Sequence, residues 1–359
     1  MANNTVLYGF VGLEYLFGEK LEDVNVATIS TAIQLTLEEH NRQIAAATGD
    51  MFAFTEEYKV RFAQPGAGTL QPLDEWGVPI PTRPAGYYDV AFPIRSAGDS
   101  FGANRIAGAL QTVADVNRHL ADVLTRDANW IRRHMLAALL DNTTWLFNDP
   151  QHGELTIQPL ANGDAITYPK RAGTMAVDTH HWAQSATVAD GTNPFPTIYT
   201  ELNEHPVNAN SQIVSYIPSN LVTAVTGLAT FVDVGDPDIT VGITSARLNN
   251  QIDRGWGDKL LGKTDGVWVV EAPILPDNYI VSNARGAASP ALLAREYPAA
   301  SLKGLQRKEH DVNGNIMQTM FFRDLGFGVY NRVGATVTFV AAGDTTYDIP
   351  SGYTNPLPV

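Results

Sequence analysis

Cysteine is absent from this sequence, which excludes disulfide bonds, thiolate chemistry and cysteine-ligated metal sites. Long apolar runs are absent too: no stretch approaches about 18 consecutive apolar residues, so we expect no membrane-spanning helix. The first residues, Met1 to Thr5, lack the basic start and apolar run of a secretory signal. Together these absences predict a protein that is made and kept in a reducing cytoplasm.

Basic residues are scarce. The 359 residues include 24 Lys and Arg against 38 Asp and Glu, which gives a formal net charge of −14. Because contacts with nucleic-acid phosphates need Lys and Arg, this balance argues against a sequence-independent DNA-binding protein. Hydrophobic residues make up 44% of the chain. That share is enough for a sizeable core, in about two to three domains or in one elaborated domain.

The beginning of the chain is expected to hold an arm and a helix. Residues 1–24 include apolar side chains without a strong period, which indicates an extended arm. Asn25 is a suitable N-cap, and apolar residues then recur at helical spacing from Val26 to Ile44. Gly49 lies beyond them as a stop signal, so the pattern predicts one helix here.

Two alternating segments follow. Residues 58–62 and 88–94 alternate apolar and polar side chains, and the proline-rich run at 78–84 lies between them. They predict a two-stranded ribbon with an irregular tip, which could reach roughly 50 to 60 Å at about 3.3 Å per residue. A compact globule of this length has a radius of gyration of only about 21 Å, so the ribbon should project. An isolated hairpin is marginally stable, so we expect a neighbouring subunit to cover its apolar face.

The longest periodic segment comes next. From Ile106 to Leu140 apolar residues recur at intervals of three and four, with charged residues on the other faces. This pattern predicts one amphipathic helix of about 35 residues, roughly 52 Å long.

Beyond this helix the pattern is mostly β. Asn162-Gly163 predicts a hairpin between strands at 155–160 and 165–168, and Asn313-Gly314 predicts another turn. The tail from Ala341 onward contains three prolines and is expected to be loosely ordered. Other expected elements are helices at 196–204 and 219–228, the latter capped by Ser219, a strand pair at 267–270 and 279–281, and strands at 212–217, 316–322, 328–330 and 335–340.

Two motif matches suggest enzymes. Residues 257–264 match the phosphate-binding loop pattern, but the preceding run is too polar for a buried strand and the following run is typical of a strand, not a helix. Residues 98–102 match a nucleophile elbow around Ser100, but the strand before them alternates polar and apolar residues. A surface loop and a hinge leading into the long helix, with Ser100 as a candidate cap, are the competing interpretations.

Asp178, His180 and His181 are the only clustered metal-ligand types. Adjacent residues on a strand point to opposite faces, so the two histidines are not expected to share one ion. A solvated loop is the interpretation we favour here. No metal, cofactor or catalytic residue is therefore predicted.

The order of these elements resembles the major capsid proteins of tailed double-stranded-DNA bacteriophages, which have the Hong Kong 97-type fold. Three passages carry the resemblance: the two ribbon strands, the helix at 106–140, and residues 328–339, which look like closing strands. The resemblance implies an α+β fold with seven parts: an N-terminal arm (1–25), the first part of a peripheral domain (26–53), an extended loop (54–105), the peripheral domain with its spine helix (106–205), an axial domain (206–315), return strands of the peripheral domain (316–343) and a C-terminal tail (344–359).

The resemblance also implies a structural protein, not an enzyme, that forms hexamers and pentamers of an icosahedral shell. The shell would enclose double-stranded DNA without sequence-specific binding, and an acidic wall suits such a container. Extended loops would lie over neighbouring subunits, which makes eight residues candidates for inter-subunit contact: Tyr58, Lys59, Arg61, Phe62, Tyr88, Val90, Phe92 and Arg95.

The remaining implications concern partners and alternatives. A separate scaffolding protein is expected because only a short arm precedes the first helix, and a portal and a decoration protein are further candidate partners. The location would be the virion, after assembly in the bacterial cytoplasm. Covalent cross-linking through a loop lysine is not expected, because the tip has none. An encapsulin on the same fold and a nucleotide hydrolase using residues 257–264 remain the alternatives.

Overall fold

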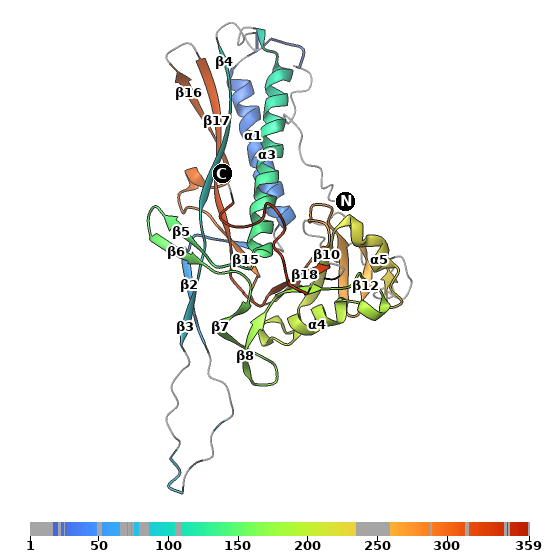
Figure 1. The fold of residues 1–359 in the computed structure, drawn as a ribbon. Helices are drawn as coiled ribbons and strands as arrows, with labels where there is room; N and C mark the ends of the chain where they lie inside the picture. The colour runs from blue at the N-terminus through green and yellow to red at the C-terminus, as the bar shows by residue number, and fades with distance from the viewer. Residues whose placement is uncertain are drawn as a thin grey trace, which may run out of the picture.

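The computed structural model describes residues 17–20, 23–24, 26–48, 52–64, 70, 73, 75–78, 86–104, 110–234, 259–287, 289–312, 316–340, 343 and 345–357 (Figure 1). The α-helices are α1 (Val26–Thr48), α3 (Val113–Leu140), α4 (Phe195–Asn203) and α5 (Val222–Thr226). The strands are β1 (Phe52–Thr55), β2 (Lys59–Ala63), β3 (Tyr87–Ala91), β4 (Arg95–Asn104), β5 (Trp145–Asp149), β6 (Gly153–Ile157), β7 (Asn162–Pro169), β8 (Met175–Thr179), β9 (His181–Gln184), β10 (Gln212–Ile217), β11 (Val232–Asp233), β12 (Lys259–Thr264), β13 (Val267–Glu271), β14 (Tyr279–Arg285), β15 (Leu292–Arg295), β16 (Leu305–Val312), β17 (Ile316–Val329) and β18 (Ala335–Val340). Short 3-10 helices are η2 (Asp190–Thr192), η3 (Pro206–Asn208), η4 (Ser219–Leu221) and η7 (Ala300–Leu302).

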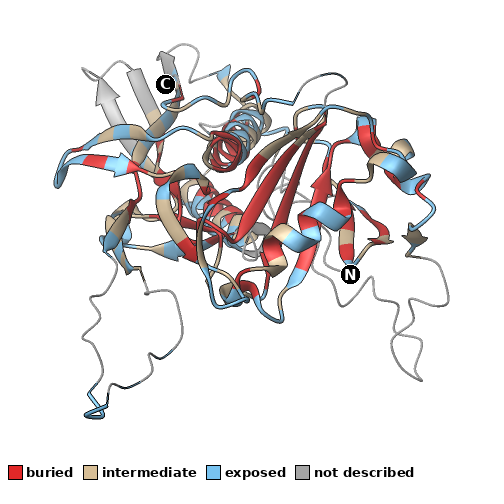
Figure 2. Cartoon of the chain, turned by 60° about the horizontal axis from the view of Figure 1, so that its bottom comes forward, coloured by how far each residue is buried: buried red, intermediate tan, exposed pale blue. Residues whose placement is uncertain are grey.

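A seven-stranded sheet forms one part of the molecule, in the order β11-β12-β13-β10-β14-β18-β9. Its central strand β10 is parallel to β13 and antiparallel to β14. The strand expected at 212–217 is therefore confirmed, but the predicted pairing of 267–270 with 279–281 is wrong because β10 lies between them. Figure 2 shows the central strands buried along their length.

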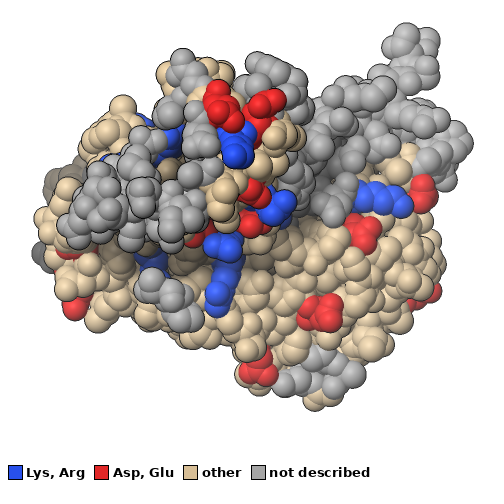
Figure 3. All heavy atoms as spheres, turned by 90° about the horizontal axis from the view of Figure 1, so that it is seen from above, with Lys and Arg blue, Asp and Glu red and all other residues tan. Residues whose placement is uncertain are grey.

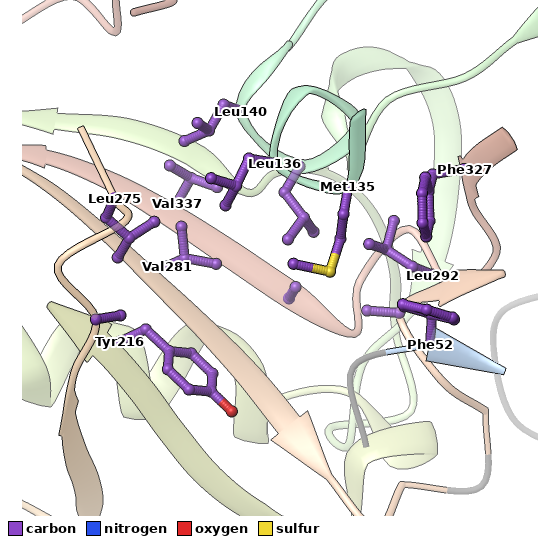
Figure 4. Close-up of a cluster of buried hydrophobic side chains, with 14 of the residues drawn as sticks. Phe52, Met135, Leu136, Leu140, Tyr216, Leu275, Val281, Leu292, Phe327 and Val337 are labelled. Atoms are coloured by element: carbon purple, nitrogen blue, oxygen red, sulfur yellow. The ribbon is translucent and has the colours of Figure 1, made fainter. Parts of the chain in front are cut away.

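The two faces of this sheet pack against different helices. Val214 and Tyr216 of β10 belong to one apolar cluster with Met135 and Leu136 of the C-terminal half of α3. Figure 4 shows Tyr216, Met135 and Leu136 in this cluster, with Val281 of β14 among them. The side chains that point the other way along β10 belong to a second cluster with α4 and α5. Burial on both faces explains why β10 is a nearly continuous apolar run.

A five-stranded sheet runs along the other part of the molecule. Its longest strand, β17, pairs antiparallel with β4, β15 and β16, and β1 adds to β15. The strands expected at 316–322 and 328–330 are thus one continuous strand. Figure 1 shows α1 and α3 side by side along β4 and β17, and apolar residues of both helices form a cluster with Phe321 of β17. The helix predicted after Asn25 is confirmed as α1.

Helix α3, which corresponds to the helix predicted at 106–140, is shorter than predicted. It has 28 residues and begins at Val113, because Thr112 caps it: the Thr112 side chain accepts from the Asp115 N–H, and the Asp115 carboxylate accepts from the Thr112 N–H. Of the predicted helix residues upstream of Val113, 106–109 lie outside the described residues. Upstream in the chain, Lys20 forms an isolated antiparallel β-bridge with Thr112. Ser100 is consequently not the cap of this helix.

The hairpin predicted at Asn162-Gly163 is wrong. The observed hairpins pair β5 with β6 and β7 with β8, and Asn162-Gly163 lies at the start of β7. The reason is a distant side chain: buried Arg332 binds the Asn162 side chain at 3.2 Å and the Asp164 carboxylate at 2.8 Å, and so holds this segment extended.

The C-terminal residues 345–357 are packed, so the prediction of a loosely ordered tail is wrong for them. The Tyr347 hydroxyl donates to the Leu140 carbonyl at 2.6 Å, and the Asn355 N–H donates to the Asp141 carboxylate at 2.6 Å. Leu357 is buried, and its carbonyl accepts from Arg95 at 2.7 Å. The tail therefore covers the C-terminal end of α3.

Of the remaining predictions about secondary structure, some are confirmed and others are wrong. The helix at 196–204 is confirmed as α4, whereas 219–228 forms only η4 and the five-residue α5, and the Ser219 hydroxyl donates to Glu271 instead of capping. The turn at Asn313-Gly314 lies outside the described residues.

The boundaries expected at 205/206 and 315/316 do not follow the sheets, since β18 joins the seven-stranded sheet and β15 and β16 join the five-stranded one. Among the described helices, none combines the length and apolarity needed to cross a bilayer.

Candidate assembly surface

The predicted ribbon is present. Strands β2 and β3 pair antiparallel from Lys59↔Ala91 to Ala63↔Tyr87. We call residues 58–63 and 87–94 the ribbon stem, and the described residues between 70 and 78 the ribbon tip. Figure 1 shows the stem pointing away from α1 and α3, with the tip at the far end of the molecule.

The apolar side of the stem is covered by its own chain. Val90 and Phe92 have no exposed surface and form a cluster with Leu293. Phe62 stacks on Tyr88 with ring centroids 5.3 Å apart and lies 5.2 Å from the ring of Tyr330. The expectation that a neighbouring subunit must cover this face is therefore wrong for the stem.

Strand β17 crosses the base of the stem closely enough to require glycine. A Cβ at Gly328 would lie 2.7 Å from the Phe92 ring, and one at Gly326 would overlap the Pro93 carbonyl. Arg295 strengthens the junction, since its guanidinium donates to the Phe92 carbonyl at 2.9 Å and to the Asp149 carboxylate at 2.7 Å. The stem is thus part of the folded body, and Val90 and Phe92 are core residues.

The polar side of the stem faces solvent. Lys59 and Arg61 both pair with Asp89, at 3.1 and 2.7 Å, and the Arg61 guanidinium lowers the pKa of Asp89 to about 2. Tyr58 is half-buried and stacks on His152 with centroids 3.9 Å apart. Arg95 is half-buried over the Trp145 ring. Of the eight candidates, Arg61 is the most accessible.

The tip exposes apolar side chains that the sequence analysis did not single out. Eleven large hydrophobic residues are exposed among the described part of the chain; four of them lie in the tip and a fifth, Tyr87, lies at the adjoining end of the stem. They are Leu70 (98% exposed), Trp76 (82%), Tyr87 (66%), Leu73 (61%) and Val78 (56%). Such a concentration is typical of a contact surface. The sequence does contain a signal for this surface. The segment holds apolar residues without alternation, and apolar residues in such a pattern cannot all lie on one buried face.

The phosphate-binding loop interpretation is wrong. Residues 259–264 form strand β12, paired antiparallel with β13, and Gly257 and Asp258 lie outside the described residues. Lys263 lies over the Trp268 ring, 5.4 Å from its centroid, and Thr264 is buried. A strand leading into a strand offers no helix N-terminus to a phosphate.

The nucleophile elbow around Ser100 is wrong as well. Ser100 lies in the middle of β4, opposite Met320 of β17, in regular antiparallel pairing. An elbow needs a sharp turn between a strand and a helix, which is missing at this position.

Asp178, His180 and His181 do not form a solvated loop; all three are buried. The two histidines do point apart, as expected: the His181 Nε2 lies 2.8 Å from the Leu139 carbonyl, whereas His180 faces His205. Burial lowers the pKa of His181 to about 4. Asp178, His180 and His205 converge instead, a grouping that sequence spacing could not indicate.

Charged residues of both signs are interspersed on the face seen in Figure 3, where Lys and Arg side chains lie beside Asp and Glu. Among the residues drawn in colour on this face, Lys and Arg therefore form no continuous basic tract for a nucleic-acid backbone.

No protein-family model and no curated protein matches this chain. Among solved structures, a chain of Mycobacterium phage Patience superposes with a TM-score of 0.69 at 18% identity, over 94% of each chain. A chain from the asymmetric unit of the bacteriophage PhiM1 mature capsid superposes with a TM-score of 0.51 at 10% identity, over 81% of this chain and 86% of that one. The fold is that of a phage capsid chain. The α+β capsid fold predicted from the order of elements is thereby confirmed.

Proposed function

We propose that this protein is the major capsid protein of a tailed bacteriophage, a structural subunit without enzymatic activity. Two observations support the proposal: the fold, which superposes on phage chains over most of its length, and the projecting ribbon with its apolar tip. The tip carries the functional argument. Four exposed large apolar side chains in the tip, with Tyr87 exposed at the adjoining end of the stem, are unfavourable in water unless another molecule covers them.

The partner that we propose is a second copy of the same chain. Subunits arranged as hexamers and pentamers would place each tip on an adjacent subunit, so that contacts individually weak are repeated around a closed shell. Lys59, Arg61 and Tyr58 on the accessible side of the stem would extend the contact. The division into arm, extended loop, peripheral domain and axial domain belongs to this proposal, with the seven-stranded sheet as the core of the axial part.

The shell would enclose double-stranded DNA in the virion after assembly in the bacterial cytoplasm. The net charge of −14 supports a wall that does not bind its contents. A separate scaffolding protein, a portal and a decoration protein complete the proposed partners. Particle contents separate this function from an encapsulin, which would hold cargo protein instead of packaged DNA.

The test uses the paired substitution Leu73→Asp and Trp76→Asp in the full chain. Both side chains are exposed, so we expect soluble subunits with unchanged circular dichroism and thermal unfolding. Shell particles should disappear in negative-stain electron microscopy, because two carboxylates would have to be buried in the contact.

Trp76→Phe is the matched control and should keep assembly. A second control, Leu35→Asp, changes an exposed apolar residue of α1 away from the ribbon. Normal shells from the doubly substituted protein would overturn the proposed role of the tip.

A further inference from the structure

A buried group of potential metal ligands lies outside the proposed assembly surface. Asp178 is in β8, His180 follows that strand, and His205 lies between α4 and η3. Asp178 is 8% exposed and both histidines are fully buried. None of the three takes part in the ribbon or its contacts, so the inference drawn from them is independent of the shell function.

The hydrogen bonds of the two imidazoles fix which nitrogen carries the proton. The Nδ1 of His180 lies 2.8 Å from the Ala335 carbonyl, and the Nδ1 of His205 lies 3.1 Å from the Pro169 carbonyl. Because a carbonyl oxygen only accepts, each Nδ1 must donate. In the neutral ring the Nε2 atom then carries a lone pair. Ligating histidines typically have this arrangement, with the second nitrogen bound to a backbone carbonyl.

The lone pairs converge. The two Nε2 atoms are 3.3 Å apart, and the Asp178 Oδ2 lies 2.9 Å from the Nε2 of His205 and 3.9 Å from that of His180. This Asp178 oxygen is buried and makes no hydrogen bond. Unless a proton or a cation lies between them, three such acceptor atoms repel one another, and the repulsion is strong in a buried site.

The spacing of these atoms fits a metal ion. Zinc bonds of about 2.0–2.1 Å in tetrahedral geometry place neighbouring ligand atoms about 3.3–3.4 Å apart. The observed separations of 3.3, 2.9 and 3.9 Å lie around that value. The donor set of two imidazole nitrogens and one carboxylate oxygen suits zinc and not magnesium or calcium, which prefer oxygen ligands.

The surrounding charges favour a divalent cation. Glu201 and Glu204 offer oxygens within 4.8 Å of Asp178, and Lys170 lies 3.5 Å from the Asp178 carboxylate and 2.6 Å from that of Glu204. Three carboxylates and one ammonium sum to −3 + 1 = −2. One divalent ion would neutralise this group. Glu204, whose Oε1 is 3.8 Å from the Nε2 of His205, is the candidate fourth ligand.

We propose that Asp178, His180 and His205 form a structural zinc site, completed by Glu204 or a water molecule. The ion would join three segments: the β7–β8 hairpin, the end of α4 and, through the His180 bond to Ala335, strand β18. It would hold the hairpin region to the seven-stranded sheet.

The test measures zinc on the full chain without a histidine tag. Protein stripped with a chelator and dialysed against zinc should bind one ion per chain by elemental analysis. Cobalt in place of zinc should give the visible absorption of a tetrahedral ion. Asp178→Asn and His205→Gln should each weaken zinc binding at least tenfold, while the control His152→Gln, at a histidine stacked on Tyr58, should leave it unchanged.

The wild-type chain alone provides a second measurement in case a variant fails to fold. Its thermal unfolding temperature should rise with zinc and return to its starting value with chelator. No zinc uptake by the wild-type chain would overturn the proposal and indicate that a proton separates the ligand atoms. Uptake that persists in a folded His180→Gln/His205→Gln variant would overturn it too. Shell formation is scored separately by microscopy, so failure of the zinc site and failure of the shell function are distinguishable.

Discussion

The ribbon stem and the ribbon tip belong to one segment of the chain but differ in what covers their apolar side chains. In the stem, Phe62, Val90 and Phe92 pack on Leu293 and Tyr330 of the same chain. In the tip, Leu70 and Trp76 face solvent. Alternating residues next to a glycine-containing strand are buried within the subunit, whereas the large apolar side chains of the tip keep more than half of their surface exposed. The difference separates residues that stabilise the subunit from residues that we propose for assembly.

The largest effect is expected from removing a stem side chain. Phe92→Ala should lower the free energy of unfolding by about 3–5 kcal/mol, because it empties a fully buried site. Trp76→Ala in the tip should change it by less than about 0.5 kcal/mol. Denaturant unfolding of the two variants measures both values. Equal losses would show that the tip is also held by its own chain.

A buried ion pair at the base of the stem gives the second test. Asp149→Ala leaves the Arg295 guanidinium buried without its carboxylate, so we expect a loss of about 3–5 kcal/mol. Arg295 also binds the Phe92 carbonyl, and the stem strands should therefore lose protection in hydrogen exchange while the rest of the chain keeps it. A uniform loss of protection would show that the stem unfolds only together with the rest of the chain, and would contradict this prediction.

Acid should weaken the body that supports the stem. Burial lowers the pKa of His134 on α3 to about 4, with help from Arg95 and Arg133. The unfolded chain binds the proton at a higher pH than the folded chain, so stability is full above about pH 6.5 and falls as the pH drops toward 4. We expect a loss of about 2 kcal/mol after allowance for partial exposure. His134→Gln should flatten this part of the profile in denaturant titrations; an unchanged profile would assign the loss to other groups.

The smallest effect is expected on the polar side of the stem. Arg61→Ala removes an exposed partner of Asp89, so we expect only a small loss of stability, which decreases further at high salt. If Arg61 contributes to subunit contacts, the same variant should slow shell formation, measured by light scattering, more than it lowers the unfolding temperature. A stability loss as large as that of Phe92→Ala would contradict the division between the two sides.

Elements set by local pattern could be predicted from the sequence. The apolar run of β10, the alternation of β2 and β3 and the helical spacing of α1 each specify their own conformation, and their order indicated the capsid fold. The predicted range of the long helix began too early. Apolar spacing continues upstream of Thr112, but the capping box at Thr112 starts the helix. Apolar periodicity alone therefore does not predict the residue at which a capping side chain starts the helix.

Features that depend on distant partners could not be predicted. Arg332 overrides the turn signal of Asn162-Gly163 from far along the chain. His205 completes the group with Asp178 and His180 only after folding, and the tail is ordered by bonds to the end of α3. In the ribbon, apolar alternation indicated a half-buried strand correctly but could not reveal that Leu293 and Tyr330 of the same chain, and not a neighbour, cover it.

Strand β17 has a mechanical consequence. It runs without interruption from its pairing with the far end of β4 to the base of the ribbon, with ten residue pairs to β4 and eight to β16. The hydrogen bonds of these ladders lie across the strand direction, so tension along β17 loads them together in shear instead of opening them one at a time. In the proposed shell, a subunit pulled outward at the ribbon would pass that tension along the strand toward α1 and α3, which would help the shell to resist pressure from within.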